Sequence, residues 1–525
     1  MKKILTQIMA IVLSCMMVSV TAGAADSQMP KWGKKTVKSI FTLKTFGADG
    51  ALMSSATGFF ISEDGEGVSS FQPFRGASNA VIIDAAGKEW PVECILGADD
   101  TYDVARFRVA AKKTVALPID STTQQATLWL QPYLEQRRLQ SMTVDRVEYF
   151  REGKQYLTLS PAAKGDNAGT PLIDGEGRAV ALLQQAAETD TLSYAVSAVF
   201  AAQLQMTGLS INSPALRATA VKKALPPTAD QALLTLYVAS AQMDSAQYAL
   251  LVEDFILQYP NEPEGYMTRA RALMAQARYD EAEQQLQQAE NVVKDRENEL
   301  VFTRLNCQRL RAEMQIAQQQ WADAISLLKE LNQGSNRSAE LFLMTSGCYA
   351  QLRDTTNQLA QLDSAVAMYQ PPYLREAAPY LLARAEARIA AHKWRQGVTD
   401  LNEYEKLMAS QLNSNFYYMR YQAEVEGRLY QQALDDIERI ISMQPSEDLY
   451  VAEKAWLQLR LGLMEEAAET ARLCISMAPQ NSDGHLFLGI ALCQTGQRKQ
   501  GLESLQKALE LGNNQASTLI EKYKQ

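Results

Sequence analysis

Histidine is scarce in this sequence, and its placement limits the chemistry open to most of the chain. Among 525 residues there are only two histidines, His392 and His485. A mechanism that needs an imidazole base is therefore excluded from the chain upstream of His392. Neither histidine has a second candidate ligand at helical spacing, so we expect both to pack or to face solvent rather than to bind a metal.

Cysteine is also rare, and it shows no metal-binding or redox spacing. None of the six cysteines belongs to a C-x-x-C pair, so zinc, iron–sulfur and dithiol sites are not expected, and we predict no cofactor. Five cysteines lie beyond the N-terminal segment, and most of them are expected to act as small buried side chains: Cys94, Cys307, Cys348, Cys474 and Cys493. Cys474 and Cys493 fall in adjoining sequence repeats, and the sequence leaves open whether they form a disulfide.

The chain has fewer basic than acidic residues and few long apolar runs. The chain has 51 Lys and Arg residues against 60 Asp and Glu residues, a balance that does not favour nucleic acid or an anionic membrane surface as partner. Beyond the N-terminus no stretch is apolar enough to span a bilayer. We therefore expect no nucleic-acid partner and no integral membrane span in the mature chain.

The N-terminus has the pattern of a cleaved secretory signal peptide over residues 1–24. Lys2 and Lys3 precede an apolar run over residues 4–20, and small residues follow it. Cleavage would remove two of the 51 basic residues, leaving 49 against 60 acidic ones and a net charge of −11. We expect a periplasmic or secreted protein. An uncleaved anchor, or a lipid on Cys15, is the alternative, and either would tether the protein to a membrane.

At 525 residues the chain exceeds what one hydrophobic core usually supports, so several domains are expected. In its C-terminal part Ala433, Ala467 and Gly501 stand 34 residues apart, and apolar residues recur in step after each. This spacing resembles the tetratricopeptide repeat, whose helix pairs stack into a solenoid. The resemblance implies an all-α solenoid of about seven full repeats over residues 231–525, with residues 516–525 as a closing helix.

An all-β domain is predicted for residues 33–205, where short runs of Val, Ile, Phe and Thr alternate with turn signals such as Asp64-Gly65. Four stretches resemble, in order, the trypsin-like serine proteases of the bacterial periplasmic high-temperature-requirement type: Ala56–Gly65, Asp99–Ala105, Asp166–Leu172 and Tyr194–Val196. The resemblance implies a double β-barrel. Residues 206–230, rich in Gly, Ser, Asn and Pro, are expected to form a linker to the repeats.

The same resemblance places the three catalytic positions at Gln72, Asp103 and Ala168. Acyl transfer in this family needs a hydroxyl nucleophile and a base that takes its proton. Alanine offers no nucleophile and a glutamine amide is no base, so we predict an inactive homologue, a pseudoprotease, in which Asp103 caps a turn. Asp166 and Thr170 stand where the family has glycines around its oxyanion-binding turn, which is a further departure.

A non-standard catalytic arrangement is the alternative. It would use a serine as nucleophile and Lys164 as base, although nothing in the sequence brings such a pair together; the candidate serines are Ser69, Ser70 and Ser160. A second hypothesis concerns binding alone. An extended peptide could add a strand beside Tyr194–Val196 without being cut, because strand addition needs backbone groups and pockets only.

Apolar and aromatic residues occupy first-helix positions that line the concave face in the repeat family: Tyr418, Met419, Trp456, Phe487 and Ile490. Such side chains suit a groove for protein or peptide partners. Burial against the closing helix or against the β-rich domain is the alternative. The lysine and asparagine of a carboxylate clamp are absent, because Arg309 and Glu313, or Ala452 and Trp456, stand at those positions.

These patterns predict a secreted or periplasmic, non-catalytic binding or scaffolding protein, in which a protease-like domain and a repeat solenoid engage protein or peptide partners. The alternative function is an active trypsin-like peptidase with unusual catalytic residues. The sequence names neither the partner nor the oligomeric state.

Overall fold

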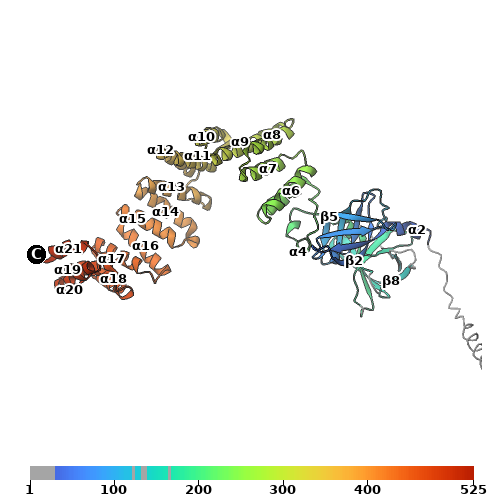
Figure 1. Ribbon diagram of the computed structural model, residues 1–525, viewed down its shortest axis with the longest axis horizontal. Coiled ribbons are helices and arrows are strands. Elements are labelled where there is room, and N and C mark those ends of the chain that lie inside the picture. The colour runs from blue at the N-terminus through green and yellow to red at the C-terminus, as the bar shows by residue number, and fades with distance from the viewer. Residues whose placement is uncertain (1–29, 121–123, 132–138, 164–166, 188, 525) are drawn as a thin grey trace, which may run out of the picture. The chain divides into compact units, whose positions relative to one another are not determined.

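The computed structural model describes residues 30–524, apart from 121–123, 132–138, 164–166 and 188. The N-terminal part is built of strands and the C-terminal part of helices (Figure 1). Two compact units, Met1–Ala272 and Leu273–Gln525, divide within helix α7 (Pro263–Ala275). The proposed signal peptide lies outside the described residues.

Six antiparallel strands close the first barrel in the order β1-β2-β3-β6-β5-β4. Its core-facing residues alternate with less buried ones, as along β1, because successive side chains of a strand point to opposite faces. The strands are β1 (Ile40–Phe46), β2 (Leu52–Phe60), β3 (Glu66–Ser69), β4 (Asn79–Ile83), β5 (Glu89–Asp99) and β6 (Val104–Val109).

Six further antiparallel strands close a second barrel in the order β10-β11-β12-β9-β8-β7. They are β7 (Thr127–Leu130), β8 (Gln140–Phe150), β9 (Lys154–Ser160), β10 (Pro171–Ile173), β11 (Ala179–Leu183) and β12 (Ser193–Ser197). The predicted all-β double barrel is confirmed. Closure satisfies the backbone groups of every strand and leaves no open sheet edge.

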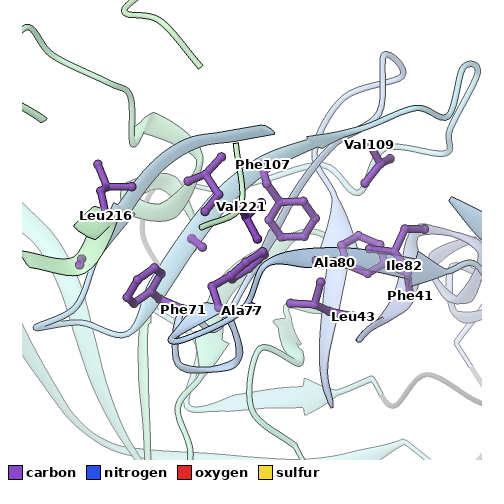
Figure 2. Close-up of a cluster of buried hydrophobic side chains, with 14 of the residues drawn as sticks. Phe41, Leu43, Phe71, Ala77, Ala80, Ile82, Phe107, Val109, Leu216 and Val221 are labelled. Atoms are coloured by element: carbon purple, nitrogen blue, oxygen red, sulfur yellow. The ribbon is translucent and has the colours of Figure 1, made fainter. Parts of the chain in front are cut away.

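The segment expected to be a linker, residues 206–230, packs against the first barrel. Leu216, on the short helix α4 (Pro214–Arg217), and Val221 insert among barrel side chains such as Phe107 (Figure 2). Backbone bonds tie the same segment to β5, with Ile95 donating to the Lys222 carbonyl at 2.8 Å and accepting from Ala224 at 2.9 Å. It therefore completes the core of the first barrel and is an ordered part of the first unit.

Short helices complete the β-rich region: α2 (Gly33–Thr36), η1 (Val37–Ser39), η2 (Gln72–Phe74), η3 (Arg151–Gly153), α3 (Ala198–Gln203) and η4 (Ser210–Asn212). The rest of the described chain is helical. Its first two helices, α5 (Ala229–Ser240) and α6 (Ser245–Gln258), belong with the first part of α7 to the first unit. Asp244 caps α6 by accepting from two backbone N–H groups, which satisfies donors that a helix start leaves open.

In the second unit, helices follow one another through short turns and each packs on the next. They are α8 (Tyr279–Val292), α9 (Glu297–Ala317), α10 (Trp321–Leu331), α11 (Ala339–Gln351), α12 (Thr355–Ala367), α13 (Ala378–Ala390), α14 (Trp394–Met408), α15 (Ser414–Glu426), α16 (Tyr430–Met443), α17 (Asp448–Leu461), α18 (Met464–Met477), α19 (Ser482–Gln494), α20 (Arg498–Glu510) and α21 (Gln515–Lys524), with short turns η5 (Gly334–Asn336), η6 (Arg375–Ala377) and η7 (Ala409–Gln411). The expected closing helix is α21.

The small residues of the 34-residue repeat lie where two helices approach most closely. Ala433 and Ala467 are fully buried. A β-carbon added to Gly501 would lie 2.4 Å from the Cys493 sulfur, and one added to Gly489 would lie 2.6 Å from Leu505 Cγ. Larger side chains would push the helices apart, so the sequence signal reports a packing requirement.

Arginine–carboxylate pairs join the two helices within each of two neighbouring repeats. Arg384 on α13 binds Asp400 on α14 through two nitrogens at 2.8 and 3.0 Å. Arg420 on α15 binds Asp436 on α16 in the same way, both bonds measuring 2.7 Å. The fork of a guanidinium matches the two oxygens of a carboxylate, which fixes the angle between the paired helices.

Candidate functional site

Gln72 and Asp103 lie side by side in the first barrel, although 31 residues separate them. Gln72 begins η2, after β3, and Asp103 stands in the turn between β5 and β6. The backbone N–H of Gln72 donates to Asp103 Oδ1 at 2.7 Å, and the N–H of Phe71 donates to the Asp103 carbonyl at 3.4 Å. The structure thus brings together two of the three positions that the protease resemblance selects.

Ala168 lies in the second barrel, just before β10, and faces the first barrel. Its carbonyl accepts a hydrogen bond from the backbone N–H of Thr57, on β2, at 3.0 Å. The next residue, Gly169, comes so close to the loop after β3 that an added β-carbon would lie 3.0 Å from the Ser70 nitrogen. The third position therefore lies at the junction of the two barrels, beside the loop that carries Gln72.

The carboxylate of Asp103 is held by groups of its own domain. Ser70 donates its hydroxyl to Asp103 Oδ2 at 2.5 Å, while Gln72 fills Oδ1 through its backbone. Burial raises the pKa of Asp103, and the hydrogen bonds from Ser70 and Gln72 oppose this rise. Asp103 itself adopts a left-handed backbone conformation with φ of 49°. The carboxylate therefore anchors its own turn to the loop of Ser70 and Gln72.

The turn at Ala168 has the backbone of a tight, glycine-dependent structure but no reactive group on the side chain. Gly169 has φ of 78°, and a β-carbon there would lie 2.0 Å from the Thr57 carbonyl oxygen. Ala168 presents a methyl group and is 8% exposed. Asp166, the predicted obstacle to oxyanion binding, lies outside the described residues, whereas Thr170 is buried at the start of β10.

The serines proposed as nucleophiles of an unusual mechanism donate their hydroxyl hydrogen bonds to other oxygen atoms of the protein. Ser69 donates to the Thr57 carbonyl at 2.7 Å, Ser70 donates to Asp103, and Ser160 donates to Asp145 at 3.0 Å. Ser69 and Ser70 are almost completely buried. Lys164, the proposed base, lies outside the described residues. The described geometry offers Ser69 and Ser70 no exposed path to a substrate carbonyl.

The hypothesis that a peptide adds a strand beside Tyr194–Val196 is wrong. These residues form part of β12, which pairs with β11 on one edge and with β9 on the other. Backbone groups on both edges are already used, so a peptide finds no open ladder there. Tyr194 is 40% exposed and stacks on Tyr156 at 6.2 Å between ring centroids.

A groove in the second unit contains four of the five residues predicted to bind a partner. Tyr418, Met419, Trp456 and Phe487 line this hollow of about 1110 Å³, which we call the repeat groove. It crosses the first helices of consecutive pairs, α13, α15, α17 and α19, and reaches Gln515 at the start of α21. Ile490 instead packs with Leu505, Ala516 and Ile520, against the closing helix.

Three acidic side chains also line the repeat groove, and the sequence prediction did not include them. They are Glu426 on α15, Glu453 on α17 and Asp483 on α19. Tyr421 donates its hydroxyl to Glu453 at 2.5 Å, which joins α15 to α17 across the groove floor. Glu453 precedes Trp456 by three residues, Asp483 precedes Phe487 by four, and Glu426 follows Met419 by seven. These spacings place each carboxylate on the same helical face, so a search of that face for charges could have found them.

The two histidines contact neighbouring protein groups, and the two C-terminal cysteines are free thiols. His392 packs edge-on against Trp394 at 5.1 Å and lies at the end of the repeat groove, while His485 contacts the Pro479 carbonyl. Cys474 and Cys493 are unpaired thiols, and burial raises the pKa of Cys474 to about 11.

The described residues contain no cluster of His, Cys, Asp or Glu side chains that could hold a metal ion. Within the described ranges no helix combines the length and hydropathy that a bilayer crossing requires.

Comparison with known proteins finds one family match in each part of the chain. Residues 56–182 match the family model of the trypsin-like peptidase domain, and residues 451–481 match that of the tetratricopeptide repeat. The two barrels form a trypsin-like domain, and tetratricopeptide-type helices follow it. The matched repeat contains Trp456 of the repeat groove.

Two solved structures are similar to the trypsin-like domain. The Rv3671c protease from M. tuberculosis, in its active form, is 16% identical, with 33% of this chain and 81% of that chain covered and a TM-score of 0.28. The serine endoprotease from Yersinia pestis is 15% identical, with 32% and 62% covered and a TM-score of 0.28. The chain thus spans less than two thirds of the Yersinia protein.

Sequence reasoning considered Ser70 only as a candidate nucleophile and missed its hydrogen bond to Asp103. Ser70 lies 33 residues before Asp103 in the sequence, so no local pattern relates the two residues. The trypsin-like domain contains a second such tie, because Gln184 accepts from the Tyr156 hydroxyl at 2.6 Å and donates to the Tyr102 carbonyl at 2.8 Å. These bonds join loops far apart in sequence, which no local pattern reports.

Proposed function

We propose that this protein is a non-catalytic binding or scaffolding protein, in which a trypsin-like domain without peptidase activity is joined to a repeat solenoid for protein or peptide partners. One observation carries the proposal. The catalytic positions hold a methyl group at Ala168 and an amide at Gln72, and the chain has no histidine upstream of His392. Peptide cleavage by this fold requires a nucleophile and a base, and both are missing.

The surroundings of Asp103 give this residue a structural role that does not depend on a catalytic base. In a working triad the aspartate orients the base and stabilises its charged form. Here the Ser70 hydroxyl and the Gln72 N–H bond to the two carboxylate oxygens, so the residue serves the two loops that it joins. The hydroxyl of Ser70 is no substitute nucleophile, because Ser70 is 2% exposed.

The repeats support a binding role. The repeat groove presents aromatic and methionine side chains, Tyr418, Met419, Trp456 and Phe487, that are only partly buried. Aromatic residues and methionine are enriched in the cores of protein interfaces, where they contribute most of the binding energy. The sequence match to a tetratricopeptide repeat spans the part of the groove around Trp456.

Loss of activity is tested with a fluorophosphonate probe and a casein substrate. The unmodified protein is expected to show neither labelling nor proteolysis, because no activated hydroxyl is available. The double variant Q72H/A168S restores the missing groups at the two positions and serves as the matched comparison. Labelling of the unmodified protein that disappears in S70A or in another single serine variant would overturn the proposal and favour an active peptidase.

We also propose that the protein is exported, on the basis of the pattern in residues 1–24. Mass spectrometry of the protein purified from its native cells is expected to show a new N-terminus just after the small-residue stretch. A retained N-terminal segment, or a lipid on Cys15, would instead show that the protein is tethered to a membrane.

A further inference from the structure

The repeat groove is acidic as well as aromatic. Glu426, Glu453 and Asp483 line it from three successive first helices, and the described lining residues include no lysine or arginine. Glu426 and Asp483 are exposed and Glu453 is half-buried. Carboxylates that share a groove with apolar walls produce a local negative potential, because the low-dielectric walls focus their field.

Aromatic rings stand next to these carboxylates. Tyr418 stacks on Tyr421 at 5.8 Å and meets Tyr450 edge-on at 6.0 Å, while Tyr421 donates its hydroxyl to Glu453. Trp456 lies on the same helix as Glu453. A ring face attracts a cation, and a carboxylate beside it adds a charge-assisted hydrogen bond.

The chain itself shows that this tryptophan accepts a guanidinium. Arg460, one helical turn after Trp456, places its guanidinium 5.9 Å from the Trp456 ring centroid and 5.0 Å from that of Tyr430. Arg460 lies outside the residues that line the groove. The groove side of the aromatic row thus has both the apolar surface and the negative charge for a cation from another molecule.

We infer that the repeat groove binds a peptide segment in which lysine or arginine residues alternate with apolar side chains. This inference rests on the proposed binding function and specifies the chemistry of the partner. The volume of about 1110 Å³ is at the upper end of the sizes usual for small-molecule pockets, roughly 300–1,000 Å³, and the lining extends over four first helices, which suits a stretch of polypeptide. The formal charge of −9 on the whole chain also favours the approach of a cationic segment.

The groove disfavours the ligand that a carboxylate clamp would take. Three carboxylates would repel an acidic segment or a free C-terminal carboxylate, and the described lining of the repeat groove contains no lysine or arginine. Basic residues border Glu426 on the side of a neighbouring pocket, which Lys393, Arg395 and Arg428 line. An apolar segment without basic residues would leave Glu426 and Asp483 beside an uncharged surface. The charge therefore selects among apolar peptides, while the aromatic rings provide contact area.

The test is fluorescence anisotropy with three labelled peptides of equal length and the purified full chain. The first peptide alternates Lys or Arg with Leu or Phe, the second carries Glu at every basic position, and the third carries Ser at every apolar position. The first is expected to bind more tightly than the other two. The variant E426Q/E453Q/D483N is expected to weaken its binding roughly tenfold, and W456A by roughly thirtyfold.

The matched control removes the same charge from another face of the same unit. Glu465, Glu466 and Glu469 are exposed on α18, a second helix, and do not line the groove. The variant E465Q/E466Q/E469Q is expected to bind the first peptide within about twofold of the unmodified protein. Far-UV circular dichroism verifies that every variant retains its helices.

Three outcomes would overturn the inference. Equal weakening in both triple variants would show that net charge, and not the groove, attracts the peptide. Tighter binding of the acidic peptide, lost in W456A, would reverse the charge assignment and leave the proposed binding function intact. Absence of binding by all three peptides would refute this ligand class for the groove. None of these outcomes bears on peptidase activity, which the fluorophosphonate assay measures separately.

Discussion

Replacing Glu424 with glutamine is expected to remove a loss of stability that develops as pH rises from about 4.5 to about 8. The Glu424 side chain on α15 is 2% exposed, and its nearest charged partner is Arg420, at 3.7 Å. Arg420 is already bonded to Asp436 at 2.7 Å and to Glu405 at 2.6 Å. Among the described residues Glu424 Oε2 has no hydrogen-bond partner. Burial, and then the negative charge of Asp436, raise the pKa of Glu424 from its usual 4.5 to about 8.

The direction of the effect follows from proton binding in the two states. The unfolded chain loses the proton of Glu424 near pH 4.5, whereas the folded chain keeps it up to about pH 8. Between these values the folded state holds one proton more than the unfolded state. Stability is therefore fully present below pH 4.5, falls by about 1.4 kcal/mol per pH unit as pH rises, and levels off above about pH 8.

The magnitude is large enough to measure. Integration from about pH 5.5 to about pH 8 gives a loss of about 3 kcal/mol from this one carboxyl. Glutamine stays neutral throughout and has nearly the same shape. We expect E424Q to lose about 3 kcal/mol less than the unmodified protein over this interval.

Urea denaturation at both pH values, followed by far-UV circular dichroism, measures the effect on the helices. The chain has two compact units, so the transition assigned to the repeats is analysed by itself. E469Q, at an exposed glutamate on α18, is the control and is expected to follow the unmodified protein at both pH values. If the free energies of unfolding of E424Q and the unmodified protein differ equally at the two pH values, the assigned protonation of Glu424 is wrong.

Two further substitutions test the geometry around the three positions that the protease resemblance selects. G169A is expected to destabilise the first unit by about 3 kcal/mol or more, because its β-carbon would lie 2.0 Å from the Thr57 carbonyl oxygen. The control G153A, also at φ of 78° but in open space, is expected to cost only about 1–2 kcal/mol. Equal losses of stability in thermal unfolding of the two variants would refute the steric argument. S70A is expected to cost about 1–3 kcal/mol because it removes a buried donor to Asp103, and unchanged stability in urea would show that this bond contributes little.

The elements of both halves could be predicted because local patterns determine them. Alternating apolar residues between turn signals predicted the strands, and recurrent small residues such as Ala433 and Gly501 predicted the helix contacts. Residues 206–230 were harder to interpret. Their Gly, Ser and Pro content is typical of a linker, but Leu216 and Val221 fill the first barrel. The Gly, Ser and Pro content indicates a backbone without long helices or strands. It does not indicate where the segment packs, which the two apolar side chains determine.

The repeat groove shows the same limit. The repeat register predicts which residues share one face of a helix, and Tyr418 and Trp456, predicted on this basis, do line the same groove. It does not say which part of that face the next helix covers, and Ile490 packs against α21 for this reason. The pairing of Arg420 with Asp436 was also missed, since an ion pair between two helices leaves no periodic signal in either of them.

Asp103 has a structural role that is independent of catalysis. Its carboxylate joins the loop of Ser70 and Gln72 to the turn between β5 and β6, and its own φ of 49° shows that this turn is tightly constrained. Removing the carboxylate would leave a buried hydroxyl and a backbone N–H without their acceptor, which costs free energy whether or not the domain cleaves peptides. By contrast, Gln72 and Ala168 hold the loops through backbone atoms, so these contacts do not depend on the chemistry of their side chains. An aspartate at this position is therefore weak support for activity, and the fluorophosphonate assay decides the question.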